Sequence, residues 1–198
     1  MGTRGFVGFQ SDDKETITYN QYDMYPSGNG VGVLEFVRGI TADPHKEEAY
    51  KAKAASVKQV NQDTLPTRDE VVNLIGLSNL NVSNRDAEEW YVLLRETHGD
   101  PRAILECGYA EHMPTWPHDS LFCEWGYLID FDRRVLEVYE GFQTSPPTEG
   151  RWAGVQSTQE AATGNTYYPV KLVAEFAFDD LPTNDEFVAK LEPNEENE

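Results

Sequence analysis

The chain has little cysteine, little positive charge and no long apolar run. Two cysteines among 198 residues exclude a disulfide framework and fit reduced, buried thiols. There are 16 Lys and Arg against 35 Asp and Glu, which gives a net charge of -19. Such a surface repels phosphate groups, so we expect no direct binding to nucleic acid or to anionic membranes. Because no apolar run approaches roughly 18 residues and the start lacks a signal-peptide core, we expect a soluble, cytoplasmic protein.

The negative charge is unevenly distributed. Residues 1–68 hold 9 acidic and 8 basic side chains, a net charge of -1, whereas residues 69–198 hold 26 and 8, a net charge of -18. Residues 192–198 are rich in glutamate and predict a solvated, flexible tail. The preceding residues, 1–191, have the size of one domain.

Strand patterns at both ends of the chain flank helical patterns in the middle. Residues 3–9 and 15–19 predict an opening hairpin, and residues 120–130 and 135–139 predict a second one. Residues 168–178 predict a last strand whose apolar side chains alternate onto one face: Val170, Leu172, Ala174, Phe176 and Phe178. We therefore expect an α+β fold in which a mostly antiparallel sheet of about five strands packs against three to five central helices.

Capping residues mark the expected helices. Asp43 and Pro44 predict a helix over 44–60. Capping pairs at Thr67 and Glu70 and at Asp86 and Glu89 predict two more, the second ending at residues 98–101, and shorter helical patterns cover 33–39 and 184–191. Residues 141–169 are dense in Gly, Pro, Ser and Thr and predict a long loop, a kind of segment that is often functional or mobile.

The most distinctive segment is the glycine-rich loop at residues 23–32. In one interpretation its backbone N–H groups cradle an anion, such as the phosphate of a nucleotide-like ligand. In the other it is a turn in which glycines adopt positive φ and a polar side chain caps the next helix. The loop lacks the Lys-Ser/Thr pair of a P-loop. The candidate ligand-binding residues are Asp23, Tyr25, Ser27, Gly28 and Gly30, with Arg4 to offset the charge of an anion.

Four residues of metal-ligand type lie close in sequence: Cys107, His112, His118 and Cys123, separated by four, five and four residues. Their order matches no standard zinc site, so we expect two buried thiols and two loop histidines, with no metal or cofactor. Residues 118–120 contain the three residue types of a catalytic triad, but sequence neighbours do not easily converge on one another. A Cys–His pair formed by Cys123 and one histidine is an open alternative.

Loop tryptophans are candidate anchors for a protein partner. Trp125 lies in a predicted strand and is expected in the core. Trp116 and Trp152 lie among Pro and Gly residues, where an aromatic ring is either covered by the loop or exposed for binding. With Glu124, these two residues form the predicted partner-binding set.

Three segments carry specific motifs: TRGFVGF at 3–9, ITYNQYDMYPSGNGVGVLEFV at 17–37 and DSLFCEWGYLIDFDRRVLEVYEGF at 119–142. In pattern form they read TRxxxGF, YxxxDxYPSGxG and DSLFCEWxYxIDxD. Together they resemble an uncharacterised family of small proteins encoded by phages and by some bacteria and fungi. The resemblance implies an approximate fold and a phage or mobile-element setting, but no mechanism.

These observations favour a non-enzymatic accessory protein that binds a host protein. One form of this hypothesis is an acidic decoy, or defence inhibitor, for a partner with a basic nucleic-acid site. The alternative is a small-ligand binding protein or hydrolase centred on the glycine-rich loop. The two hypotheses differ in whether that loop lines a pocket or only closes a turn.

Overall fold

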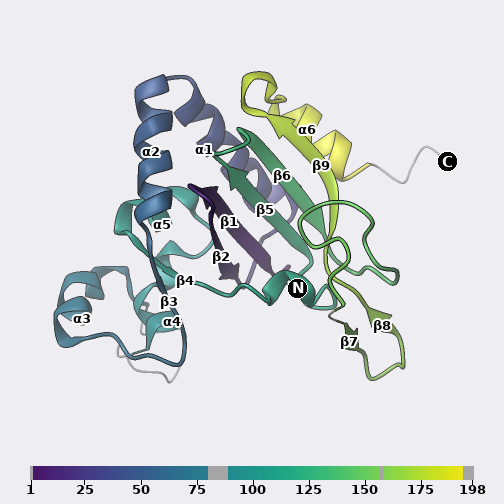
Figure 1. Ribbon diagram of the computed structural model, residues 1–198, viewed down its shortest axis with the longest axis horizontal. Coiled ribbons are helices and arrows are strands. Elements are labelled where there is room, and N and C mark those ends of the chain that lie inside the picture. The colour runs from purple at the N-terminus through teal and green to yellow at the C-terminus, as the bar shows by residue number, and fades with distance from the viewer. Residues whose placement is uncertain (1, 80–88, 157, 194–198) are drawn as a thin grey trace.

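A computed structural model describes residues 2–79, 89–156 and 158–193 (Figure 1). A five-stranded sheet in the order β2-β1-β5-β6-β9 forms its centre. The strands are β1 (Gly5–Ser11), β2 (Lys14–Asn20), β5 (Trp125–Asp130), β6 (Val135–Glu140) and β9 (Lys171–Ala177). Neighbouring strands pair antiparallel except β1 and β5, which run parallel. This confirms the predicted α+β fold with a mostly antiparallel sheet.

Tight turns close the two hairpins. Asp12 and Asp13 connect β1 to β2, and both have positive φ, 51° and 60°. Two central residues with positive φ are the mark of a turn that matches the twist of the flanking strands. At the second hairpin the Asp130 carboxylate accepts hydrogen bonds from the N–H groups of Asp132 and Arg133, at 3.0 and 2.8 Å.

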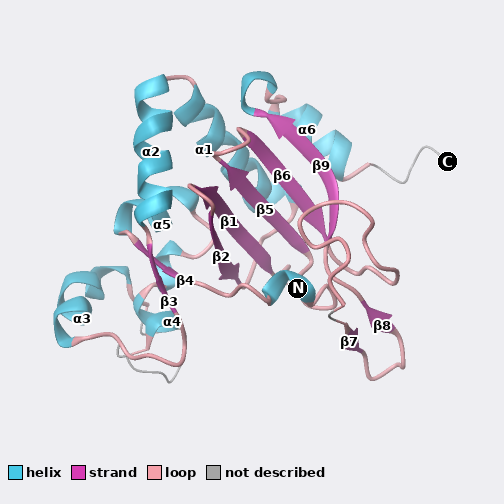
Figure 2. Cartoon of the chain, viewed as in Figure 1, coloured by secondary structure: helices cyan, strands magenta, loops and turns pink. Residues whose placement is uncertain are grey.

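Helices cover one face of the sheet (Figure 2). They are α1 (Val31–Thr41), α2 (Pro44–Ser56), α5 (Pro101–Cys107) and α6 (Asn184–Leu191). The main core packs the apolar side chains of these helices against one set of alternating strand residues, such as Val7, Tyr127 and Val138. Within the described residues, no helix is long and apolar enough to cross a membrane.

The other face of the sheet is covered by part of the 141–169 segment. Trp152 packs there against Phe6 and Tyr139, with ring centroids 5.4 and 4.5 Å away. The rest of this segment includes a small hairpin of β7 (Gln159–Glu160) and β8 (Thr166–Tyr167), seen at the lower right of Figure 1.

A satellite unit lies at the lower left of Figure 1. It comprises β3 (Lys58–Val60), α3 (Arg68–Leu74), α4 (Trp90–Leu93) and β4 (Tyr109–Glu111), with β3 and β4 paired in parallel. Its small apolar core includes Val60, Leu74 and Trp90.

The structure corrects three predicted elements and adds one helix. The helix expected over 44–60 ends at Ser56, because residues 58–60 pair with β4. The strand expected from residue 120 begins at Trp125, because the N–H groups of Phe122 and Cys123 turn back to the Asp119 carbonyl. Helix α5 was not predicted, although Asp100 caps it. The helix expected to begin after Asp86 is α-helical in α4, Trp90–Leu93, among the described residues. Asp86 itself lies outside the described residues.

The last strand also differs from its predicted pattern. The register of β6 and β9 shifts between Val138 and Tyr139, which face Ala174 and Leu172. One extra residue therefore lies in β9, as in a β-bulge. As a result, Ala174 packs on the helix side and Leu172 on the other side, so the expected single apolar face is wrong. Most of the predicted tail, residues 194–198, lies outside the described residues.

Candidate functional site

A hollow of about 630 Å³ lies where β1 and β5 begin and β2 and β6 end, at the lower end of the sheet in Figure 1. We call it the aromatic hollow. Its lining residues come from four neighbouring chain segments and are Gly2, Thr3, Arg4, Tyr19, Gln21, Tyr22, Tyr25, Leu121, Phe122, Glu124 and Phe142. All except Gly2 belong to the three motif segments identified in the sequence. The parallel pairing of β1 with β5 therefore brings these segments to one place.

The strand β1 is held tightly at the base of the aromatic hollow. The Arg4 carbonyl accepts a hydrogen bond from the Glu124 N–H at 2.9 Å, and the Arg4 N–H donates to Glu124 Oε1 at 3.3 Å. A Cβ on Gly5 would lie 1.8 Å from the Trp125 carbonyl oxygen. Only glycine permits this approach, so the sequence Arg-Gly places the Arg4 side chain beside the segment preceding β5.

Exposed aromatic rings form the rim. The exposed fractions are 51% for Tyr22, 44% for Tyr25, 38% for Phe122 and 53% for Phe142. Among the described residues, seven large hydrophobic side chains are exposed, and these four all line the aromatic hollow. Scattered exposed apolar side chains are normal in soluble proteins, but a contiguous group marks an interaction site.

The rim also contains unusual backbone geometry. Phe142 has a φ of 55°, a left-handed conformation that bulky residues rarely adopt. Its N–H donates to the Ser120 carbonyl at 2.7 Å, which holds the conformation in place. Asp23, between the rim residues Tyr22 and Tyr25, has a φ of 62°. Because such strain costs roughly 1–3 kcal/mol and clusters at functional sites, it supports a binding role for this rim.

Two arginines set the electrostatics of the aromatic hollow. The Arg4 guanidinium lies 4.7 Å from the centroid of the Phe122 ring, and that of Arg95 lies 5.2 Å from the centroid of Tyr22. Burial raises the pKa of the Tyr19 hydroxyl, whereas both guanidinium groups act to lower it. Both cations are therefore close enough to favour negative charge at the hollow.

The glycine-rich loop contributes only Tyr25 to the lining. The N–H groups of Gly28 and Gly30 donate to the Tyr25 carbonyl, and that of Asn29 donates to the Asp23 carbonyl, at 2.7–3.1 Å. These N–H groups are satisfied within the loop, so they are not available to an anion. Gly30 is buried against Tyr127, and Ser27 is exposed but does not line the hollow. The loop forms a packed turn, Pro26–Gly30, that leads into α1. The predicted details of this turn are wrong, because Gly28 and Gly30 have φ values of -99° and -56° and no side chain among the described residues caps α1.

The two loop tryptophans have structural contacts. Trp152 is 5% exposed and belongs to the core on the loop side of the sheet, so it is not an exposed anchor. Trp116 is half-buried, its Nε1 donates to the Gly5 carbonyl at 3.0 Å, and its ring meets that of Tyr19 edge-on. Trp116 thus supports the wall of the aromatic hollow. Glu124, the third predicted partner-binding residue, lines it directly.

The four candidate metal ligands make separate contacts. Cys107 contacts the backbone of Tyr109, and His112 Nδ1 accepts a hydrogen bond from the Ile17 N–H. Burial lowers the pKa of His118, and it raises the pKa of Cys123, which is fully buried. Within the described ranges, no group of three or more His, Cys, Asp or Glu residues is placed to hold a metal ion.

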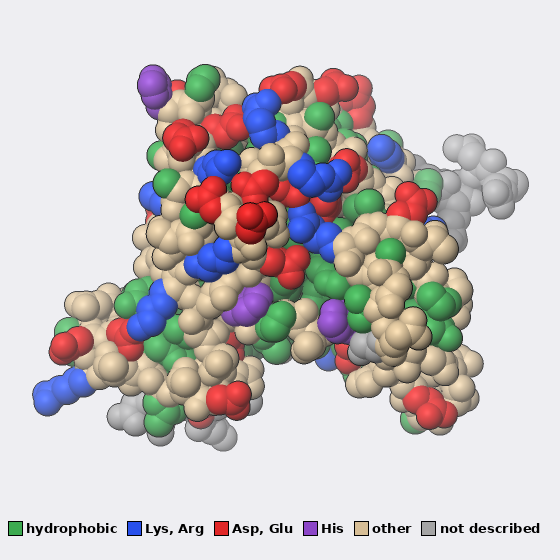
Figure 3. All heavy atoms as spheres, in the orientation of Figure 1, with side chains coloured by type: hydrophobic (Ala, Val, Ile, Leu, Met, Phe, Trp, Pro, Cys, Tyr) green, Lys and Arg blue, Asp and Glu red, His purple; other side chains and the backbone are tan. Residues whose placement is uncertain are grey.

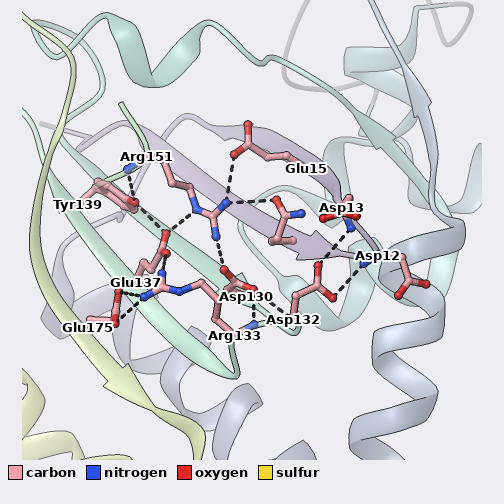
Figure 4. A network of polar contacts seen from close by, with 11 residues as sticks. Asp12, Asp13, Glu15, Asp130, Asp132, Arg133, Glu137, Tyr139, Arg151 and Glu175 are labelled. Carbon is pink, nitrogen blue, oxygen red and sulfur yellow. Dashed lines mark hydrogen bonds and ion pairs between the residues drawn. The ribbon is translucent and has the colours of Figure 1, made fainter. Parts of the chain in front are cut away.

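A second, ionic hollow of about 580 Å³ lies at the opposite end of the sheet (Figure 4). Asp130 and Glu137 are each 1% exposed there. Arg151 reaches in from the 141–169 segment and pairs with both carboxylates, through Nη2 to Asp130 and through Nε to Glu137 at 2.7 Å. Arg133 pairs with Glu137 from the outer side at 2.6 Å. These interactions fasten the covering segment to the sheet.

Sequence reasoning identified Arg4, Tyr25 and Glu124 but assigned them to different sites. It missed Thr3, Tyr19, Tyr22, Phe122 and Phe142 of the aromatic hollow, and the ionic hollow as a whole. Charged residues inside otherwise apolar strands, such as Glu137, are the signal that could have indicated the ionic hollow, because buried charges require partners. The exposed rings carry no comparable signal, since apolar side chains in strand-flanking segments are usually buried.

No protein-family model, curated protein or solved structure matches this chain.

Proposed function

We propose that this chain is an accessory protein that binds a partner protein in the host cytoplasm, with the aromatic hollow as its main contact surface. The observation that carries the proposal is the grouping of four exposed aromatic rings around one concave site. Aromatic residues dominate the binding energy of many protein interfaces because they bury a large area at a low cost in conformational entropy. The phage or mobile-element setting comes from the sequence resemblance.

The aromatic hollow supports this role better than the acidic surface does. A decoy for a nucleic-acid site requires carboxylates that are free to imitate phosphates. Around the ionic hollow, by contrast, carboxylates pair with Arg133 and Arg151, and Glu47 and Asp179 pair with Arg134. Acidic and basic side chains are likewise interspersed over the upper part of the face shown in Figure 3. In this region, therefore, paired carboxylates give the acidic decoy less support than the exposed rings give the aromatic hollow.

The small-ligand alternative has less support. The volume of the aromatic hollow lies within the range of ligand pockets, and Arg4 could offset the charge of an anion. However, the loop N–H groups that would have cradled a phosphate are already bonded. A thermal-shift screen with nucleotides tests this alternative, and we expect no stabilisation.

A quantitative pull-down from host lysate tests the proposed function. The double variant Tyr25→Ala/Phe142→Ala should fail to retain the partner protein that the unaltered chain retains. The matched control is Leu65→Ala/Val72→Ala, which removes two exposed apolar side chains, 70% and 66% exposed, that lie outside the aromatic hollow. Equal retention by both variants would refute the role of the hollow. Retention that disappears at high salt regardless of the variant would favour the acidic decoy.

A further inference from the structure

The aromatic hollow contains a cation that forms no ion pair among the described contacts. Burial raises the pKa of the Asp119 carboxyl group and the Arg4 guanidinium acts to lower it, so Asp119 is a charged neighbour of Arg4 without pairing with it. Among the described contacts, the Arg4 guanidinium forms no ion pair and no hydrogen bond; it stacks on Phe122. The Arg4 side chain is half-buried in a chain with 35 acidic residues. Glu124 lines the same hollow, yet its described hydrogen bond is to the Arg4 backbone N–H, not to the guanidinium.

Two polar side chains near Arg4 also lack an anionic or hydrogen-bonding partner among the described contacts. Arg95 is 6% exposed, and its described hydrogen bonds are to neutral groups, His98 Nδ1 at 3.1 Å and Gln21 Oε1 at 3.5 Å. The hydroxyl group of Thr3, a lining residue that is 1% exposed, has no hydrogen-bond partner among the described residues. A buried hydroxyl without a partner costs free energy, so polar groups beside the hollow are incompletely satisfied.

We propose that the aromatic hollow binds a carboxylate-bearing segment of the partner protein. An aspartate or glutamate side chain of the partner accepts hydrogen bonds from the Arg4 guanidinium, and an adjacent apolar side chain packs between the exposed rings of Tyr25 and Phe142. This inference rests on the proposed function, because it specifies the chemistry of the partner at the same surface.

Charge complementarity favours a carboxylate over other groups. A guanidinium binds a carboxylate through two parallel hydrogen bonds, and stacking on Phe122 presents the planar group in one orientation. A partner's cation would meet Arg4, which already covers one face of the Phe122 ring. A phosphate with two charges would be repelled more strongly than a carboxylate by Glu124 and by the net charge of -19.

Selection from a displayed random-peptide library tests the inference. The unaltered chain should enrich peptides with Asp or Glu next to an aromatic or aliphatic residue. For a selected peptide, Arg4→Gln should lower affinity by about 10- to 100-fold, and replacing its acidic residue with Gln or Asn should cause a similar loss. The peptide whose acidic residue is replaced should bind the Arg4→Gln variant nearly as well as it binds the unaltered chain, because the interaction is already lost. Arg68→Gln, the matched control, removes an exposed guanidinium elsewhere and should leave affinity unchanged.

The outcomes separate this inference from the proposed function. In another outcome, the library enriches apolar peptides with no preference for Asp or Glu, which the variant Tyr25→Ala/Phe142→Ala no longer binds. This result would overturn the role of Arg4 and leave the hollow as a binding surface. Peptides retained by that double variant would overturn both. Enrichment of basic peptides would overturn the carboxylate assignment and favour the acidic decoy. Because the described contacts include no hydrogen bond or ion pair of the Arg4 side chain, Arg4→Gln should fold normally, and circular dichroism checks this.

Discussion

Replacing Arg151 with alanine should destabilise the fold more than any other single change in the ionic hollow. The Arg151 guanidinium is the described side-chain partner of Asp130 Oδ2, and it also donates to Glu137 Oε2 at 2.7 Å. Asp130 Oδ1 keeps two backbone donors without it, and Glu137 keeps Arg133 and the Tyr139 hydroxyl. The alanine variant therefore leaves Asp130 Oδ2 without its described partner and removes one of the three described donors to the Glu137 carboxylate.

The expected loss in the free energy of unfolding is about 3 kcal/mol. Removing one partner of a buried ion pair costs about 3–5 kcal/mol, and the remaining donors place this site at the lower end of that range. Arg133→Ala is the matched control, because it removes a second arginine from the same Glu137. Its side chain is 54% exposed, so solvent screens the interaction and the loss should be about 1 kcal/mol. Urea denaturation at neutral pH, followed by tryptophan fluorescence, measures both values.

Removal of the orphaned charge provides a second control. In the double variant Arg151→Ala/Asp130→Asn, the amide oxygen can still accept from the two backbone N–H groups, but no buried charge remains unpaired. This variant should be more stable than Arg151→Ala alone. The reasoning fails if Arg151→Ala costs no more than Arg133→Ala, or if the asparagine substitution makes Arg151→Ala worse, because either result would mean that water reaches the carboxylates.

Burial, close packing and backbone strain give three further predictions. Burial, assisted by a nearby guanidinium, lowers the pKa of His98 to about 4, so the unfolded state binds a proton at higher pH than the folded state does. This linkage should lower stability by up to about 3 kcal/mol from pH 6.5 to 4, so urea titrations across this range should show a clearly shallower slope in His98→Gln than in the control His45→Gln. His112 and His118, whose pKa values burial also lowers, contribute to the slope that remains. A Cβ on Gly126 would lie 1.9 Å from a carbon of the Phe6 ring, so Gly126→Ala should lower the free energy of unfolding, measured in urea, by about 1–3 kcal/mol or more. The control is Gly39→Ala in α1, where an added Cβ has no neighbour within 4 Å, and it should not lower the free energy of unfolding. Similar losses of stability in the two variants would refute the packing argument. Finally, Phe142→Gly should relieve the backbone strain at a φ of 55° and raise the free energy of unfolding by about 1 kcal/mol, while it weakens partner binding. A loss of both stability and binding would contradict the view that the strain at Phe142 serves binding.

Local sequence patterns predicted the fold class but not the assembly of the site. Alternating apolar residues and turn-forming aspartates specify the two hairpins through contacts between near neighbours. Arg4 and Glu124, however, are 120 residues apart, and their contact depends on the parallel pairing of β1 with β5, which no local pattern encodes. The extra residue in β9 is similarly invisible, because the apolar alternation continues through it while the strand register changes.

The parallel pair at the centre of the sheet also determines when a nascent chain can assemble the aromatic hollow. The first hairpin can form as soon as residues 5–20 leave the ribosome, since its contacts are local. The wall built from Leu121, Phe122 and Glu124 is synthesised about 100 residues later, and Phe142 later still. A truncated product that ends before residue 121 can fold its hairpin but cannot assemble the hollow. Premature termination or early proteolysis therefore yields fragments without the assembled hollow, which under the proposed function would not compete with the longer chain for a partner.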